Sequence, residues 1–354
     1  MTQERNGLAR VAGLATRNVT LAGCAALCVM GATVSADGKA TYTTIDVPGS
    51  AWTQADSIND NGTITGTYPC GGSVTGGFVR TAGGSFKTFS AYPCTGQSAN
   101  ETDPDSIDAK GEITGSVSAR GTFGGFVRNM HGKIKSIVLG PALTNDSAIR
   151  PTGINDNGFV TGFVDYSGEG RDKGFVRAPG GRVVIFTPPG SIATYPLSIN
   201  DSGAIAGYYE DSDSHMHGFV RAADGTIASF DPPGSAGTRA IAISDAGEIT
   251  GDYNDSNEID HGFVRAVDGT ITSFIAFGTT QMTPMSINSK GWVTGSYTAN
   301  IRFHGFVRAP DGTITSFDPP GSTLTYPLAI NNTGAITGYY SDRRGTYHGF
   351  LRTR

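Results

Sequence analysis

The segment that decides the fold is residues 286–322, SINSKGWVTGSYTANIRFHGFVRAPDGTITSFDPPGS. It holds four short blocks, namely Ser-Ile-Asn, Gly-x-Val-Thr-Gly, Gly-Phe-Val-Arg and Asp-Gly-Thr-Ile-Thr-Ser-Phe, followed by Pro-Pro-Gly-Ser. The blocks are rich in β-branched and aromatic residues and are separated by Gly, Asn and Asp, a composition typical of strands joined by tight turns. Because proline has no N–H to donate to a ladder, Pro-Pro ends the sheet. The segment therefore predicts a four-stranded antiparallel sheet.

The same blocks recur along the chain at steps of 43 to 49 residues. The Gly-Phe-Val-Arg block, or its Gly-Phe-Leu-Arg variant, places Phe78, Phe126, Phe175, Phe219, Phe263, Phe306 and Phe350. The Ser-Ile-Asn-type block places Ile58, Ile107, Ile154, Ile199, Ile243, Ile287 and Ile330. Such repeats are typical of a β-propeller, whose blades bury both faces against their neighbours. We predict one all-β domain over residues 37–354, a seven-bladed β-propeller of four-stranded antiparallel blades. A solenoid is the alternative, and it would need distinct end caps.

The ends of the chain predict how the ring closes. The seventh unit stops after Gly349-Phe350-Leu351-Arg352 and has no fourth strand. Residues 41–46, Thr-Tyr-Thr-Thr-Ile-Asp, match Thr313 to Asp318 and are also followed by Pro-Gly-Ser, yet no first three strands precede them. We expect this N-terminal strand to complete the last blade, which also removes a free sheet edge.

Residues 1–36 have the features of an export signal. Three arginines precede an apolar run from Val19 to Val34, and Val34-Ser35-Ala36 offers small residues for cleavage before Asp37. A spanning helix is the alternative, although the run is shorter than the roughly 20 residues that a bilayer requires. Leu21-Ala22-Gly23-Cys24 also resembles a lipoprotein cleavage box. We expect a secreted or periplasmic protein, without a membrane anchor after cleavage.

Charge and cysteine content narrow the possible partners. A net charge of -5 gives no electrostatic reason for nucleic acid to bind, because phosphate neutralisation needs clustered Lys and Arg. Of the four cysteines, Cys24 and Cys28 lie in the signal. Cys70 and Cys94 remain, both in a Tyr-Pro-Cys context, and we predict a disulfide between them because an exported chain meets an oxidising compartment.

The repeats, with a Gly-Tyr strand followed by His-Gly-Phe, resemble the extracellular HAF-repeat proteins of bacteria over residues 41–354. The histidine stands at His217, His261, His304 and His348, whereas Gly76, Gly124 and Lys173 replace it in the first three units. The resemblance implies export and a propeller-like fold, and it names no ligand.

Residues shared by all units are explained by the unit itself. We therefore interpret the repeated Arg of Gly-Phe-Val-Arg as structural, pairing with turn aspartates such as Asp60, Asp156 and Asp201. The four histidines belong to four different blades and cannot converge on one metal, so they are structural as well. A site belonging to one place should lie where the units differ.

One variable position is four residues before the repeated isoleucine, where the chain is expected to enter the central channel. A ring that mixes arginine, aspartate, tyrosine, amide and hydroxyl groups can hold a polar or anionic ligand by hydrogen bonds and stacking. The alternative is that these are exposed loop residues that are free to vary. The predicted ligand-binding residues are Gln54, Asp103, Arg150, Tyr195, Arg239, Thr283 and Tyr326.

Two other clusters contain residue types that can bind metal ions. Asp252 to Asp260 is acidic enough to suggest calcium, but it lacks the ligand spacing of an EF-hand loop and is interpreted as a solvated loop. His215 and His217 with Asp211 and Asp213 could bind a transition metal, although His217 already belongs to the repeat. We assign no metal and no cofactor.

These observations favour a monomeric binding or scaffold module that recognises a glycan, peptide or small anion at the channel mouth. The alternative is a propeller enzyme, a lyase or hydrolase acting on a polysaccharide or peptide. In it Asp103 or Asp105 would serve as general base, and Arg150 or Arg239 would stabilise developing negative charge. No catalytic residue is assigned, because propellers host both classes.

Overall fold

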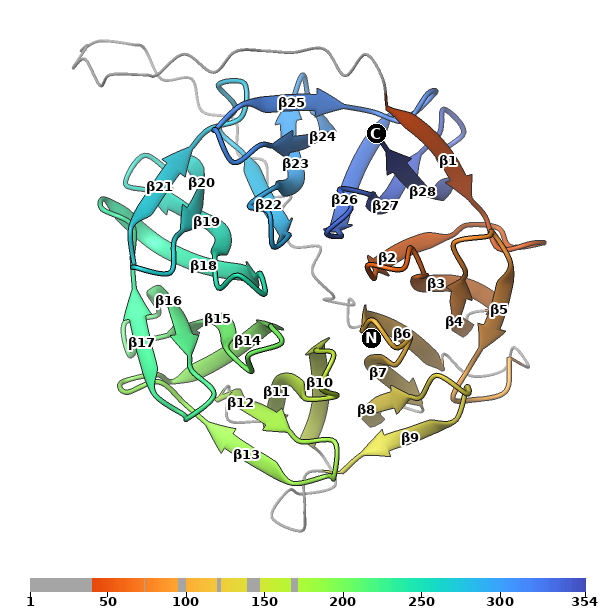
Figure 1. Ribbon diagram of the computed structural model, residues 1–354, viewed down its shortest axis with the longest axis horizontal. Coiled ribbons are helices and arrows are strands. Elements are labelled where there is room, and N and C mark those ends of the chain that lie inside the picture. Colours follow the sequence, from red (N-terminus) through yellow and green to blue (C-terminus); the bar gives the residue numbers. More distant parts are fainter. Residues whose placement is uncertain (1–39, 73, 95–99, 120–121, 139–146, 167–170) are drawn as a thin grey trace, which may run out of the picture. The chain divides into compact units, whose positions relative to one another are not determined.

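The computed structural model describes residues 40–354 apart from 73, 95–99, 120–121, 139–146 and 167–170. It contains seven four-stranded antiparallel sheets that stand as blades around a common centre (Figure 1). The predicted all-β, seven-bladed propeller is thus confirmed. The expected signal sequence lies outside the described residues. Within the described part, no helix is long and apolar enough to cross a membrane.

Each blade runs from an innermost first strand to an outermost fourth strand. Blade one comprises β2 (Gln54–Ile58), β3 (Ile64–Gly71), β4 (Val74–Arg80) and β5 (Phe86–Phe89). Blade two comprises β6 (Glu101–Ile107), β7 (Ile113–Ala119), β8 (Thr122–Arg128) and β9 (Ile134–Ile137). Blade three comprises β10 (Ser147–Ile154), β11 (Val160–Tyr166), β12 (Lys173–Arg177) and β13 (Val183–Phe186). Blade four comprises β14 (Ala193–Ile199), β15 (Ile205–Glu210), β16 (Met216–Arg221) and β17 (Ile227–Phe230).

The last three blades follow the same order. Blade five comprises β18 (Ser235–Ile243), β19 (Ile249–Asp255), β20 (Asp260–Arg265) and β21 (Ile271–Phe274). Blade six comprises β22 (Met282–Ile287), β23 (Val293–Ala299), β24 (Arg302–Arg308) and β25 (Ile314–Phe317). Blade seven comprises β26 (Leu324–Ile330), β27 (Ile336–Ser341), β28 (Tyr347–Thr353) and, as its outer strand, β1 (Thr41–Ile45).

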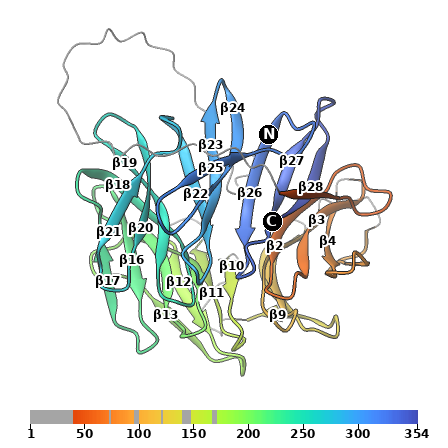
Figure 2. The same cartoon turned by 45° about the horizontal axis from the view of Figure 1, so that its top comes forward.

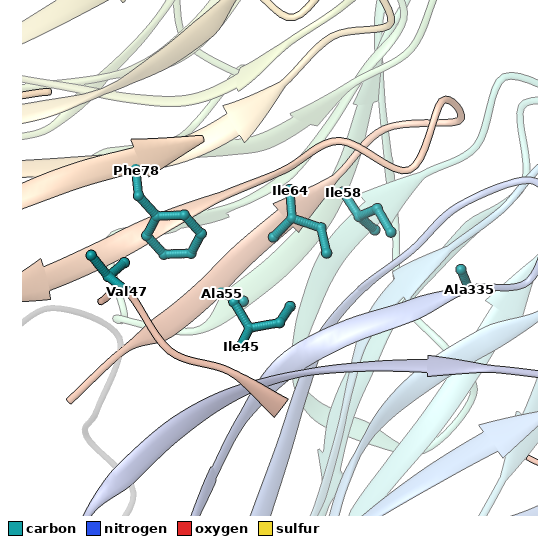
Figure 3. Packing of buried hydrophobic residues seen from close by; sticks show 7 residues of the cluster. All are labelled: Ile45, Val47, Ala55, Ile58, Ile64, Phe78 and Ala335. Atoms are coloured by element: carbon teal, nitrogen blue, oxygen red, sulfur yellow. The ribbon is translucent and has the colours of Figure 1, made fainter. Parts of the chain in front are cut away.

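The predicted closure by the N-terminal strand is confirmed. Strand β1 pairs antiparallel with β28, from Thr41 opposite Thr353 to Ile45 opposite Gly349. Beyond the strand, Asp46 Oδ1 lies 2.9 Å from His348 Nδ1. Ile45 is fully buried in a cluster that includes Phe78 of blade one (Figure 3). Strand β1 therefore completes the last blade and also packs against the first.

Small and hydroxyl residues of the repeat hold the first three strands of each blade close together. In blade three, Thr161 Oγ1 donates to the carbonyl of Phe175 at 2.9 Å, a bond that recurs in five other blades. In blade four, a Cβ added to Gly207 would lie 2.2 Å from the Tyr195 carbonyl oxygen. No larger residue fits this close approach of the first and second strands, which explains the second glycine of the Gly-x-Ile-Thr-Gly block.

The repeated arginines are structural, but the predicted partners were wrong. The Arg308 guanidinium lies 5.0 Å from the centre of the Phe274 ring, which belongs to the outer strand of the preceding blade. Arg128, Arg221, Arg265 and Arg352 stack on their neighbouring blades in the same way. The turn aspartates instead accept hydrogen bonds from neighbouring turns, as when the Asp156 N–H donates to Asp201 Oδ1 at 2.9 Å. Cation–π stacking thus joins the blades at this position.

The four histidines each join a loop to a blade. His217 stacks on Tyr209, with its ring nitrogens 2.7 Å from Asp231 Oδ2 and 3.2 Å from Asp211 Oδ2. The rings of His261, His304 and His348 each lie against the tyrosine of the second strand in the same way. The structural interpretation of these histidines agrees with these contacts.

Candidate functional site

The two faces of the propeller differ as expected from the strand directions. Figure 2 shows the hairpin joining β23 to β24 and the one joining β27 to β28 on one face, which we call the loop face. The Asn-Asp turns after each first strand lie on the other face, the turn face. The seven predicted ligand-binding residues share one position on the innermost strands, near the loop face, and all are half-buried.

Several of these residues contact the preceding blade. Tyr195 contacts the Phe163 ring of blade three at 5.2 Å between centroids, and Tyr326 contacts the Phe303 ring of blade six at 4.7 Å. The Arg150 guanidinium stands 5.3 Å from the centre of the Phe123 ring. At these three blades the variable residue therefore packs against the neighbouring blade.

Two aromatic groups lie on opposite sides of the centre, one on β14 and β15 and the other on β26 and β27 (Figure 1). In the first, Tyr195 stacks on Tyr208 with centroids 4.8 Å apart. In the second, Tyr326 lies 5.1 Å from Tyr339, which in turn touches Tyr347. Burial raises the pKa of Tyr326 to about 12, so its hydroxyl remains a hydrogen-bond donor at neutral pH. These aromatic groups offer flat apolar faces beside hydroxyl donors.

Arg239 is committed to a buried partner. Its Nε donates to Asp252 Oδ1 at 2.9 Å and its Nη2 donates to Asp252 Oδ2 at 2.5 Å. The Asp252 carboxylate raises the pKa of Arg239 well above its usual range, in spite of burial. This bidentate pair neutralises the guanidinium, so Arg239 offers less to an anion than its sequence position predicts.

Three carboxyl groups of blades one and two lie close together. Thr67 Oγ1 donates to Asp56 Oδ2 at 3.1 Å, and Thr75 Oγ1 donates to Asp103 Oδ1 at 2.9 Å. Removal from bulk water raises the pKa of Asp56 to about 8, helped by the negative charge of Asp103. The pKa of Asp105 is raised for the same reasons, although its side chain remains exposed inside the ring. Asp56 is therefore largely protonated at neutral pH, able both to donate and to accept a hydrogen bond.

The side chains around the centre near the loop face form a ring that we call the rim. Further acidic groups belong to this rim beyond blade two. The Tyr195 hydroxyl donates to Asp172, whose pKa is raised by burial to about 6. In blade five, burial and the charge of Asp252 raise the pKa of Asp260 to about 6. Around Arg150 and Arg239, the rim thus carries an excess of carboxyl groups, namely Asp56, Asp103, Asp105, Asp172, Glu210, Asp252 and Asp260.

The sequence predicts the rim residues of the first strands but not those of the second strands. Tyr208, Tyr339 and Asp252 lie on second strands, directly opposite Tyr195, Tyr326 and Arg239 in the register. The repeat could have revealed them, since the residue after the second glycine of Gly-x-Ile-Thr-Gly varies between units. A second missed position lies two residues before the repeated isoleucine and is half-buried or exposed at the centre; it holds Asp56, Asp105, Thr152, Leu197, Ile241, Met285 and Leu328.

The side chains of Gln54 and Thr283 offer an amide and a hydroxyl at the same level as the aromatic groups. They oppose Thr67 and Ser296 of the second strands. At blades one and six these positions of the innermost and second strands are therefore polar and uncharged.

The predicted disulfide is present, with Cys70 and Cys94 joined by an S–S bond of 2.09 Å. It ties the end of β3 to the segment after β5. The acidic segment after Asp252 forms a tight hairpin in which Asp255 Oδ1 accepts from the N–H groups of Asn257 and Ile259. Asp211, Asp213 and His215 come within 4.8 Å of one another at a hairpin tip, where Asp211 accepts from backbone N–H groups of its own turn.

Two hollows open on the turn face. One, of about 200 Å³, is ringed by the turns of all seven blades. The other is a groove of about 530 Å³ between blades three and four, where Phe159 and Val184 lie beside Arg182 and Asp224. Neither includes the seven predicted ligand-binding residues.

Comparison with solved structures agrees with the fold. Virginiamycin B lyase from Staphylococcus aureus matches with a TM-score of 0.61 and 12% identity, covering 89% of this chain and all of that one. Puromycin hydrolase matches with a TM-score of 0.60 and 13% identity, over 90% of this chain and 55% of that one. A lectin from Burkholderia pseudomallei matches with a TM-score of 0.51 and 9% identity, over 85% and 95% of the two chains. The fold is thus shared with lyases, hydrolases and lectins.

No protein-family model matches the sequence, and no curated protein sequence matches it. At these identities the likeness concerns the fold alone, since propellers carry different functions on one architecture.

Proposed function

We propose that this protein is an exported binding module that holds a glycan at the loop face of the propeller. The observation that carries the proposal is the pair of aromatic groups, Tyr195 with Tyr208 and Tyr326 with Tyr339, on opposite sides of the centre. A pyranose ring has an apolar face of C–H groups, which can pack on a tyrosine ring. It also has hydroxyl groups around its edge. The carboxyl groups of the rim offer acceptors for those hydroxyls, and the protonated Asp56 also offers a donor.

The charge of the rim argues for a neutral glycan over a small anion. Arg239 is already paired with Asp252, and the remaining arginine, Arg150, faces several carboxyl groups. An anion would be repelled by the carboxylates and would have to compete for the guanidinium. A basic peptide would be attracted by the negative charge of the rim. Binding of basic peptides alone in the test below would therefore count against the glycan.

The test is a binding screen on the chain from residue 37 to 354. Neutral hexasaccharides of glucose, xylose and N-acetylglucosamine, an acidic hexasaccharide and a set of basic and acidic peptides are screened by thermal shift, because a ligand of the native state raises the melting temperature. We expect a neutral glycan to raise it. A screen in which only peptides or only acidic saccharides bind contradicts the proposal.

Two variants then place the ligand. Tyr195→Ala and Tyr326→Ala should each weaken glycan binding at least tenfold, since truncating a central aromatic contact costs about 1.4 kcal/mol or more. Phe159→Ala is the matched control, because Phe159 is an exposed aromatic residue on the turn face. Equal affinities in all three variants would place the ligand elsewhere.

An enzyme is the second candidate, favoured by Asp56 and Asp105. With a pKa of about 8, the carboxyl group of Asp56 can give up and take back a proton near neutral pH, as general acid–base catalysis requires, and the pKa of Asp105 is raised as well. In this alternative Asp103 or Asp105 removes the proton and Arg150 stabilises the charge that develops. If a bound polysaccharide is cleaved and cleavage disappears in Asp103→Asn or Asp105→Asn, the enzyme is the correct account.

Export and state of assembly complete the proposal. Residues 1–36 act as the export signal, and the mature chain is a monomer of the HAF-repeat type in the periplasm or outside the cell. The Cys70–Cys94 disulfide supports an oxidising compartment. N-terminal sequencing of the protein recovered from culture medium or periplasm, with a start near Asp37, tests this part.

A further inference from the structure

A hydrogen-bonded belt runs around the turn face of the propeller. It is formed by the residue that follows the repeated isoleucine, which is an asparagine in five of the seven blades. In each, Oδ1 accepts from the N–H group four residues later, and Nδ2 donates to the main-chain carbonyl at the same position of the next blade. The five inter-blade bonds are 2.8–3.0 Å long and join Asn59 to Asp108, Asn155 to Asn200, Asn200 to Ser244, Asn288 to Asn331 and Asn331 to Asn59.

Blade two breaks the pattern with Asp108. Its Oδ1 behaves as in the asparagines, accepting from the Glu112 N–H at 2.7 Å. Its Oδ2 therefore takes the place of the amide nitrogen, which in the other blades faces the carbonyl of the next blade, here that of Asn155. Asp108 is only 3% exposed, and its Oδ2 is buried without a hydrogen-bond partner. A buried carboxylate oxygen next to a carbonyl brings two acceptors together, which is costly.

The surroundings of Asp108 do not compensate for its charge. Glu112 of the same turn and Asp156 of the next blade are both acidic and face it, and the Lys110 N–H donates to it. The ammonium group of Lys110 is used elsewhere, donating to the Asp156 carbonyl at 2.5 Å. On the side of blade one, the Asn59 amide donates to the Asp108 main-chain oxygen and leaves the carboxyl group alone. Burial, and then these acidic neighbours, raise the pKa of Asp108 to about 6.

We propose that Asp108 is a proton-operated link of the belt. As a carboxylic acid, its Oδ2–H donates to the Asn155 carbonyl and joins blade two to blade three. As a carboxylate, it loses the proton to solvent and leaves that link open. The ring is thus held by one more inter-blade bond in mildly acidic surroundings than at higher pH. Ser244 leaves the other gap, and its hydroxyl accepts from the Glu248 N–H of its own turn.

The experiment compares the parent chain with Asp108→Asn by equilibrium unfolding at pH 4.5 and pH 7.5. Because the pKa of Asp108 is higher in the folded protein than in the unfolded one, the parent gains stability from this group as the pH falls. Asparagine makes the link at every pH. We expect the ratio of the two folding equilibrium constants, parent over variant, to rise about 25-fold between pH 7.5 and pH 4.5. Titrations of groups that do not interact with Asp108 cancel in this ratio.

Two variants keep the test decisive. Ser244→Asn fills the other gap without a titrating group, so its effect on stability should be the same at both pH values. Asp108→Ser also removes the carboxyl group, and it is used in place of Asp108→Asn if that variant does not fold. The stability of the parent relative to Asp108→Ser should again rise as the pH falls. A parent-to-variant ratio that is the same at both pH values, for whichever Asp108 variant folds, overturns the proposal.

Discussion

Replacing Ile45 by alanine should destabilise the whole propeller, although Ile45 lies in a short strand at the N-terminal end of the described chain. Ile45 is fully buried and packs with Ala55, Ile64 and Phe78 of blade one. The same strand pairs with β28 of blade seven. Losing this side chain therefore weakens the contact that joins the last blade to the first.

The magnitude follows from what is removed. Three buried carbon groups at about 0.8 kcal/mol each give about 2.4 kcal/mol of lost transfer free energy. The cavity left among rigid neighbours adds about 1.5 kcal/mol, because a closed ring relaxes little around it. We expect Ile45→Ala to lower the free energy of unfolding by about 4 kcal/mol, and the melting temperature by roughly 8 °C.

The assay is urea unfolding followed by circular dichroism, with Thr43→Ala as the control. Thr43 lies in the same strand and is exposed, so its replacement should change stability by less than about 0.5 kcal/mol. If Ile45→Ala unfolds at the same urea concentration as Thr43→Ala, the strand does not hold the ring and the closure has no energetic role.

Three further predictions concern other parts of the ring. Replacing Cys70 and Cys94 by alanine should cost about 3 kcal/mol, as expected for a loop of 24 residues in the chain-entropy model, and non-reducing electrophoresis should show faster migration of the parent. Burial lowers the pKa of His217, but the two aspartate partners raise it by more than burial lowers it, so the pKa lies above the usual range. The stability that His217 contributes is therefore fully present below about pH 6.5 and is lost as the pH rises through the raised pKa. His217→Gln should remove that part of the pH dependence of the melting temperature, and an unchanged profile would argue against the pair. Asn331→Ala breaks the belt between blade seven and Asn59 and should lower the free energy of unfolding by about 1–3 kcal/mol in calorimetry; no change would show that the belt is incidental.

Repetition made the fold predictable from sequence. Because the same blocks occur in seven units, a strand that is doubtful in one unit is clear in the others. The unmatched segment at residues 41–46 predicted that the N-terminal strand closes the ring. The pairing of Arg308 was not predictable in the same way, because a turn aspartate and an outer-strand phenylalanine are both plausible neighbours of its guanidinium. Only the packing of adjacent blades decides between them, and it favours the Phe274 ring.

The site was predictable in part. The variable position before the repeated isoleucine pointed to Tyr195 and Tyr326, which do lie beside further aromatic rings. Sequence gave no sign that Arg239 is paired with Asp252, because that contact depends on the register between the first and second strands. The one-residue bulge in the innermost strands sets this register, and short sequence blocks do not reveal it.

We propose that the aromatic groups at the loop face hold a glycan. The most direct measurement is calorimetric titration of the double variant Tyr195→Ala and Tyr326→Ala, beside the parent chain, with the neutral hexasaccharide that raises the parent's melting temperature most. We expect heat of binding for the parent and a loss of affinity of about a hundredfold or more for the variant. Equal affinity of the two chains for that hexasaccharide would contradict it.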